Sequence, residues 1–272
     1  MKIVVIGGTG LVGSKVVRLL TERGHDAVPA SPNTGVNTIT GEGLAEALTD
    51  AAVVVDVSNS PSLDGDAAQT FFQTATPNLL AAERAAGVGH HVALSVVGTE
   101  ELAVERGYFK AKLAQEKLIA KSGVPYSIVH ATQFFEFVNG IADEATDGDT
   151  VRLAPAYFQP MASADVAEAV AITAVDAPRN GVHEVGGPEM FRLDELIRTA
   201  LAARNDPRTV VADPDAGYWG APVGEYTLTP AEGATLFETR FDTCWPTRRC
   251  ADAAVLHRRN GHLRRLRSVR RG

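Results

Sequence analysis

The sequence predicts an α/β fold in which helices cover both faces of a parallel sheet. Short apolar runs such as Ile3–Ile6 and Val53–Val57 alternate with helical patterns such as Ala67–Ala86, as in βαβ units. A glycine-rich segment directly follows the first apolar run, and 272 residues suffice for one large core. Together these observations indicate a doubly wound sheet.

The spacing of apolar residues and the positions of glycine and proline predict the individual elements. Strands are expected at 3–6, 26–30, 53–57, 92–94 and 126–130, and helices at 11–23, 42–48, 67–86 and 108–121. Beyond residue 133 the pattern is less regular, with helices up to 142, at 164–175 and at 193–203, and strands at 150–153 and 182–185. We expect a domain over 1–242, in which about 133–242 forms a small substrate lobe.

Composition and charge restrict the class of protein. The chain is 45% hydrophobic and 22% charged, which is typical of a globular domain. The first apolar run is too short for a signal peptide or a membrane span, so a cytoplasmic protein without a membrane partner is expected. Residues 1–242 carry a net charge of −15, which argues against a nucleic-acid partner. Cys244 and Cys250 have no second Cys/His pair at zinc spacing, so no metal site is expected.

The strongest motif lies between the first strand and the first helix. Its residues are Gly7, Gly8, Thr9, Gly10, Leu11, Val12 and Gly13. The glycines allow a tight turn, a close approach of the backbone to a diphosphate, and close packing of helix against strand. A diphosphate would meet free N–H groups and the positive end of the helix dipole. The motif predicts a Rossmann-type dinucleotide site; the alternative is a glycine-rich turn in a related fold that has lost its nucleotide.

The end of the second strand bears on the choice of cofactor. NAD-binding proteins usually carry an Asp or Glu there, which binds the ribose 2′-hydroxyl. This chain has Ala30-Ser31 instead, so NADP is favoured and NAD stays possible. Ser31 could bind a 2′-phosphate, and Lys15 or Arg18 could reach that phosphate from the first helix.

Tyr108 and Lys112 form a Y-x-x-x-K motif on a predicted helix, where residues four apart share one face. A nearby ammonium would lower the pKa of the phenol and let Tyr108 exchange a proton with a carbonyl or alcohol oxygen. Lys112 would also hold the nicotinamide ribose, and Ser95, at the end of a strand, would position the substrate oxygen. The alternative is a chance motif in which Tyr108 packs, Lys112 is a surface charge and Ser95 only ends its strand.

Weaker signals lie at two further strand ends. Asn59 follows the strand at 53–57 and is a candidate for the nicotinamide ribose, although a turn residue is an equal alternative. Gln133, Phe134 and Phe135 follow the strand at 126–130, at the carboxyl edge where ligands bind in α/β sheets. We expect Gln133 to touch the nicotinamide or the substrate, and the phenylalanines either to wall an apolar substrate or to pack in the core.

The chain resembles the NmrA-like, atypical short-chain dehydrogenase/reductases over about residues 1–242. The resemblance rests on GGTGLVG (7–13), ALSVVGT (93–99), GYFKAKLAQEKLI (107–119) and PYSIVHATQFFEF (125–137). It implies a Rossmann core that binds NAD(P) and a smaller C-terminal substrate lobe. The reaction stays open, because the family includes quinone and dye reductases, nucleoside-sugar relatives and redox sensors without turnover. Many members lack the Tyr–Lys pair that this chain retains.

The last thirty residues, 243–272, stand apart from this resemblance. They contain nine arginines and one acid, Asp252. A basic arm that binds an anionic surface or partner is one reading. Because similar sequences end near residue 243, we expect a non-native extension, such as a shifted reading frame, that activity does not require.

These patterns lead to two hypotheses of different class. The first is an NAD(P)H-dependent oxidoreductase that reduces a small carbonyl or quinone-like substrate, with Tyr108 as proton donor, Lys112 as its electrostatic partner and Ser95 as a positioning group. The second is a non-catalytic sensor of the NADP redox state. The sequence does not identify the substrate or the oligomeric state.

Overall fold

A computed structural model describes residues 1–103 and 107–244, so residues 245–272, which make up nearly all of the arginine-rich tail, lie outside the described residues. The chain divides into two compact units. Unit 1 contains residues 1–95, 107–130 and 166–183, and unit 2 contains residues 96–103, 131–165 and 184–244. Unit 2 resumes close to residue 133, where the substrate lobe is expected to begin. It also includes 96–103, while 166–183 return to unit 1.

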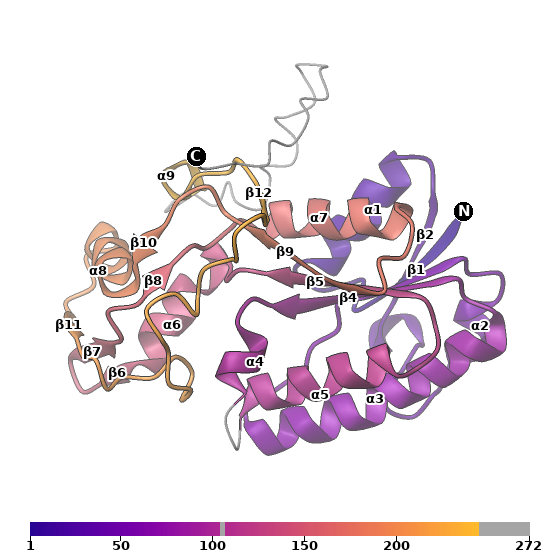
Figure 1. Ribbon diagram of the computed structural model, residues 1–272, viewed down its shortest axis with the longest axis horizontal. Coiled ribbons are helices and arrows are strands. Elements are labelled where there is room, and N and C mark those ends of the chain that lie inside the picture. The colour runs from indigo at the N-terminus through magenta and orange to yellow at the C-terminus, as the bar shows by residue number, and fades with distance from the viewer. Residues whose placement is uncertain (104–106, 245–272) are drawn as a thin grey trace. The chain divides into compact units, whose positions relative to one another are not determined.

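The main sheet has seven strands in the order β12-β9-β5-β4-β3-β1-β2 (Figure 1). They are β1 (Lys2–Ile6), β2 (Asp26–Ala30), β3 (Val53–Asp56), β4 (His90–Val96), β5 (Tyr126–Ala131), β9 (Gly181–Gly186) and β12 (Thr235–Leu236). β1 pairs in parallel with both β2 and β3, and β3 pairs in parallel with β4. The strand order therefore reverses between β1 and β3, and ligands of α/β sheets bind beyond the carboxyl ends of strands at such a reversal.

Helices lie on both faces of this sheet (Figure 1). They are α1 (Gly13–Glu22), α2 (Leu44–Leu48), α3 (Gly65–Ala86), α5 (Tyr108–Ala120) and α7 (Ser163–Val175). α3 and α5 pack side by side on one face, whereas α1 and α7 share the other, where Arg23 forms an ion pair with Glu168. The expected doubly wound α/β fold is confirmed.

Local sequence explains where α3 begins and ends. The Asp64 carboxylate accepts the N–H of Ala67 at 3.0 Å and so caps the helix N-terminus. Gly87 ends the helix in the left-handed conformation, with φ of +71°. Between them, buried residues such as Phe72 and Leu79 form the apolar stripe that faces the rest of unit 1.

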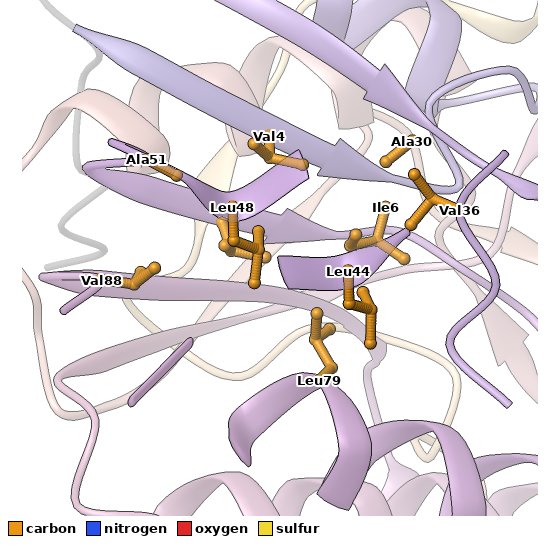
Figure 2. Close-up of a cluster of buried hydrophobic side chains, with 10 residues drawn as sticks. Val4, Ile6, Ala30, Val36, Leu44, Leu48, Ala51, Leu79 and Val88 are labelled. Atoms are coloured by element: carbon orange, nitrogen blue, oxygen red, sulfur yellow. The ribbon is translucent and has the colours of Figure 1, made fainter. Parts of the chain in front are cut away.

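An apolar cluster beside β1, β2 and β3 holds these strands in place (Figure 2). Its buried members are Val4, Ile6, Ala30, Val36, Leu44, Leu48, Ala51, Val54, Leu79 and Val88. Each large aliphatic side chain buried in this way stabilises the fold by about 1.5–3 kcal/mol. The cluster includes Ile6 at the end of β1 and Ala30 at the end of β2, so it supports the edge of the sheet where ligands bind.

Unit 2 contains two small sheets besides β12. One has three strands in the order β11-β7-β6, and the other pairs β10 with β8 in antiparallel fashion. The strands are β6 (Thr146–Asp147), β7 (Thr150–Leu153), β8 (Tyr157–Phe158), β10 (Phe191–Arg192) and β11 (Thr209–Ala212). The helices are α4 (Thr99–Leu102), α6 (Val138–Glu144), α8 (Leu193–Ala203) and α9 (Phe241–Cys244).

The elements expected from the sequence are present with shifts of a few residues at their ends. α1 begins at Gly13 rather than at residue 11, and β4 spans His90–Val96 rather than 92–94. The two-residue strands of unit 2, β11 and the short helices α4 and α9 were not expected, because segments so short show no periodicity. None of the helices in the described part of the chain is long and apolar enough to cross a membrane.

Candidate active site

The glycine loop connects β1 to α1 and has no room for side chains at two key positions. Gly7 has φ of +78°, and a Cβ there would lie 2.9 Å from backbone atoms of Ser58. A Cβ on Gly13 would lie 2.2 Å from the carbonyl oxygen of Gly7, so only glycine fits at this first position of α1. The loop thus brings bare backbone to the edge of the sheet, which is what a bound diphosphate requires.

Free backbone donors lie at the start of α1. The N–H groups of Leu11, Val12 and Gly13 donate to no acceptor within the described residues. Thr9, Gly10 and Leu11 are exposed, so this end of the helix is open to solvent. Unpaired amides at the positive end of a helix dipole are the arrangement that binds anions in proteins, and the predicted dinucleotide loop has the backbone geometry that its motif requires.

The turn after β3 contacts the glycine loop and also reaches Tyr108. Ser58 lies against Gly7, as described above, and the next residue, Asn59, accepts a hydrogen bond from the Tyr108 hydroxyl at 2.9 Å. Asn59 is exposed and Tyr108 is half-buried. Three residues expected at the site are therefore brought together in unit 1, at the reversal between β1 and β3.

The Tyr108 phenol differs from expectation in its acidity. We expected the ammonium of Lys112 to lower its pKa, but burial raises the pKa of Tyr108 above its ordinary value, and the hydrogen bond to Asn59 opposes this only partly. Tyr108 packs edge-on against Phe72 with ring centroids 6.3 Å apart. The phenol therefore stays protonated at neutral pH and is suited to donate a proton rather than to accept one.

Lys112 lies one helical turn after Tyr108 and is 3% exposed. Its Nζ donates to the carbonyl oxygen of Leu94 at 2.8 Å and to Oε1 of Gln115 at 2.5 Å, and it lies 4.8 Å from the centroid of the Phe72 ring. Burial lowers the pKa of Lys112 to about 8, although the carboxylates of Asp56 and Glu116 oppose the shift. The surface-charge alternative is wrong, because this ammonium is enclosed. An ammonium has three hydrogens, and the two oxygen acceptors named here use two of them.

Ser95 is 3% exposed at the carboxyl end of β4. Its hydroxyl donates to Oε1 of Glu116, which also accepts from His130 at 3.0 Å. The interaction with His130, then the hydrogen bond from Ser95 and the charge of Lys112, outweigh burial and hold the pKa of Glu116 below its usual range. While Glu116 is ionised, the hydrogen of Ser95 is committed to it, and Ser95 presents only acceptor lone pairs to a ligand.

Ser31 and Lys15, the residues predicted to bind the ribose 2′-phosphate of NADP, have two different environments. Ser31 follows β2 and is 7% exposed, and its Oγ has no hydrogen-bond partner within the described residues. Lys15 folds back on the glycine loop, where its Nζ donates to the carbonyl oxygen of Leu11 at 2.8 Å. A positive charge is therefore held at the loop expected to bind phosphate.

The predicted substrate residues belong to unit 2 and differ among themselves. Gln133 is 5% exposed, and neither Oε1 nor Nε2 has a partner within the described residues. Phe135 is fully buried and packs edge-on against Phe241 at 5.3 Å, as the core alternative predicts. Phe134 is half-buried and stacks at 5.2 Å on Phe137, which is 47% exposed. The exposed aromatic surface thus comes from Phe134 and Phe137.

Sequence reasoning missed three buried polar residues, Asp56, Gln115 and Glu116. Gln115 and Glu116 follow Lys112 by three and four positions, so they share its buried face on α5. A run of polar residues at helical spacing on the face opposite the exposed Lys110 was the available signal. Asp56 ends an otherwise apolar strand, which gave a weaker one.

Comparison with known proteins agrees with this geometry. The model of the family described as NAD(P)H-binding matches residues 7–178. The photosystem II assembly factor Ycf39 of Synechocystis sp. is 24% identical over 218 residues, which are 73% of this chain and 66% of that protein. This chain therefore spans just under two thirds of the length of that relative.

Two solved structures have the same fold. The NADPH-dependent quinone oxidoreductase QOR2 from Escherichia coli, complexed with NADPH, is 20% identical with a TM-score of 0.61, covering 78% of this chain and 77% of that chain. The UDP-glucose 4-epimerase from Thermus thermophilus, complexed with NAD, is 18% identical with a TM-score of 0.63, covering 84% of this chain and 92% of that chain. At these identities the likeness establishes the fold.

Proposed function

Because the chain belongs to the NAD(P)H-binding family, we propose that it is an NAD(P)H-dependent reductase of a small carbonyl or quinone-like substrate. The observation that carries the proposal is the turn after β3. There Ser58 lies against the glycine loop and Asn59 accepts the Tyr108 hydroxyl at 2.9 Å. A protonated phenol is thereby held beside a dinucleotide loop.

The residues of unit 1 fit a nicotinamide dinucleotide. The glycine loop, 7–13, takes the diphosphate, because a Cβ at Gly7 or Gly13 would fill the space the backbone needs. Asn59 and Lys112 would hold the nicotinamide ribose. We propose NADP as the preferred form, with Ser31 on the 2′ side, since no acid follows β2 and Lys15 adds positive charge to the loop.

Tyr108 acts as the proton donor in this proposal. A reduced nicotinamide, when bound, would supply the hydride that the carbonyl carbon of the substrate accepts. As the carbonyl electron pair moves to oxygen, the Tyr108 hydroxyl exchanges its hydrogen bond to Asn59 Oδ1 for one to that oxygen, delivers its proton there and is reprotonated from solvent. A product alkoxide is more basic than a phenolate, so the raised pKa of Tyr108 does not prevent the transfer. Ser95 is left out of this step, because its one hydrogen is donated to Glu116 and a carbonyl oxygen needs a donor. Lys112 is proposed to stabilise the transient phenolate.

Within unit 2, we propose Gln133 and Phe134 as substrate contacts. Gln133 offers an amide with unpartnered donor and acceptor groups, and Phe134 adds half-buried aromatic surface. Burying an unpaired amide costs roughly 1–3 kcal/mol, which a ligand with complementary groups would relieve. Carbonyl and quinone oxygens are such groups.

Replacing Tyr108 by Phe tests the proposal. With a set of aldehydes, ketones and quinones and both reduced cofactors, we expect Tyr108→Phe to lower kcat for carbonyl reduction by about 100-fold or more, because a general acid contributes about 10²–10⁴. Quinone reduction should fall less, because water can protonate the product. The dissociation constants of NADPH and NADH, measured alongside, should change less than about threefold, because the loop is intact.

The control removes the same hydroxyl from Tyr126, at the amino end of β5. Tyr126→Phe should leave both rate and affinity unchanged. Unaltered carbonyl reduction in Tyr108→Phe would remove Tyr108 from the mechanism. Cofactor binding without turnover of any substrate would favour the redox sensor, and absence of cofactor binding would refute both functions.

A further inference from the structure

Asp56 is a buried carboxylate whose hydrogen bonds all lead toward the candidate active site. It is 3% exposed at the last position of β3. Its Oδ1 accepts the N–H and the hydroxyl of Ser58, at 3.0 Å and 2.6 Å. Its Oδ2 accepts Nε2 of Gln115 at 3.0 Å. One carboxylate therefore binds both the turn that carries Asn59 and the helix that carries Lys112.

Gln115 connects this carboxylate to Lys112. Its Nε2 donates to Asp56, so its Oε1 is the atom that accepts from Lys112 Nζ, at 2.5 Å. Gln115 is 1% exposed, which means that water does not compete for either bond. An amide suits this place, because it has a donor for a carboxylate at one end and an acceptor for an ammonium at the other.

The Lys112 ammonium is enclosed by groups from four elements. Asp56 on β3 and Glu116 on α5 are the two carboxylates that stabilise its charge, and Glu116 is itself bonded to His130 on β5. The Phe72 ring on α3 and the Leu94 carbonyl on β4 complete the surroundings. A buried charge without such partners would be costly.

We propose that Asp56 and Gln115 form a positioning pair, which holds the Lys112 ammonium and the turn bearing Asn59 in their working arrangement. This role rests on the proposed function, since Lys112 and Asn59 are its cofactor ligands. Asp56 and Gln115 touch neither substrate nor cofactor and act through their neighbours. The pair connects α5 to the carboxyl end of β3, where the turn after the strand contacts the glycine loop.

The charge of Lys112 provides a readout that does not depend on turnover. In cofactor-free protein with ¹³C-labelled lysine, the Cε resonance of Lys112, assigned by its loss in Lys112→Met, should titrate near pH 8. In Asp56→Asn the midpoint should fall by about one pH unit, because a stabilising negative charge is gone. In Gln115→Leu it should also fall, because the ammonium loses an acceptor and the residue that connects it to Asp56.

The matched control is Ser58→Ala, which removes one bond to Asp56 but keeps its charge, so the Lys112 midpoint should stay near the native value. In the loaded enzyme, Asp56→Asn should lower kcat roughly fivefold at pH 8 and little at pH 6, with KM unchanged, because fewer molecules carry the charged lysine.

The possible outcomes separate this inference from the proposed function. Equal Lys112 midpoints in native protein, Asp56→Asn and Gln115→Leu would overturn the pair, even in an active enzyme. Midpoints that shift as expected in a protein that reduces nothing would support the coupling and refute the reductase. A shifted midpoint with an unchanged pH profile of kcat would overturn the positioning role.

Discussion

Unit 1 buries charged side chains in two places, toward opposite ends of β4. Near the amino end, His91 Nδ1 and Glu83 Oε1 are 2.7 Å apart and both side chains are 0% exposed. Near the carboxyl end, Lys112 bonds to Leu94 and Gln115. We call Glu83 and His91 the closed pair. We call Lys112 together with Asp56, Gln115 and Glu116 the site cluster.

The two places differ in their connection to solvent. The closed pair is fully buried, and Glu83 Oε2 and His91 Nε2 have no partner within the described residues. The site cluster leads through Glu116 to His130, whose side chain is 12% exposed, and it lies beside the half-buried Tyr108. Buried charge by itself therefore does not mark a functional site. What distinguishes the candidate site is that its buried charge continues to the partly exposed His130.

Removing one member of the closed pair should produce the largest change in stability. Glu83→Leu leaves His91 without the carboxylate that, against the effect of burial, raises its pKa. We expect a loss of about 3–5 kcal/mol in urea unfolding, because one member of a buried pair is left alone. The affinity for NADPH of the remaining folded protein should be native.

The double variant Glu83→Leu with His91→Leu supplies the control. It replaces both polar groups by apolar ones and should recover most of the lost stability. A loss under about 1 kcal/mol in the single variant would contradict the picture of a dedicated pair.

A substitution in the glycine loop should have its large effect on cofactor affinity rather than on stability. The Cβ of Gly13→Ala would lie 2.2 Å from the Gly7 carbonyl oxygen and must displace the loop. Because the loop supplies the diphosphate donors, we expect NADPH and NADH affinities to fall by about 100-fold or more, measured by titration calorimetry.

Gly89→Ala is the matched change near the closed pair, since its Cβ would meet only the Ala52 carbonyl oxygen, at 3.6 Å. It should leave cofactor affinity unchanged. Equal losses in the two variants would mean that affinity reports general stability rather than loop geometry.

The pH dependence of stability should show a smaller effect from His90, which neighbours the closed pair. Burial lowers the pKa of His90 from 6.5 to about 4. The unfolded chain therefore binds more protons between these values, and stability falls as pH decreases through this window. From pH 7 to pH 5 the loss due to His90 should be about 2 kcal/mol.

His90→Gln should remove this part of the acid sensitivity while keeping a polar partner for Ser127, which now lies 2.9 Å from His90 Nε2. Urea unfolding at pH 7, 6 and 5 measures the difference. A variant with the same slope as the native protein would show that folding does not lower the pKa of His90.

The sequence predicted much of this molecule because several signals are local. The glycine spacing predicted a dinucleotide loop, and the match of the NAD(P)H-binding family confirms the family resemblance. Helical spacing placed Tyr108 and Lys112 on one helix, α5. The acidity of Tyr108 was wrongly expected to be enhanced, because burial depends on Phe72 and other residues distant in the chain.

By itself, then, the sequence determined the alternation of strands and helices, the backbone-only loop after β1 and the Tyr–Lys spacing, because each depends on residues within one or two turns of each other. Tertiary structure alone decided which groups Lys112 and Ser95 contact. Asp56, Leu94 and Gln115 come from three different elements, and they meet only when parallel strands bring their carboxyl ends to one edge of the sheet beneath α5.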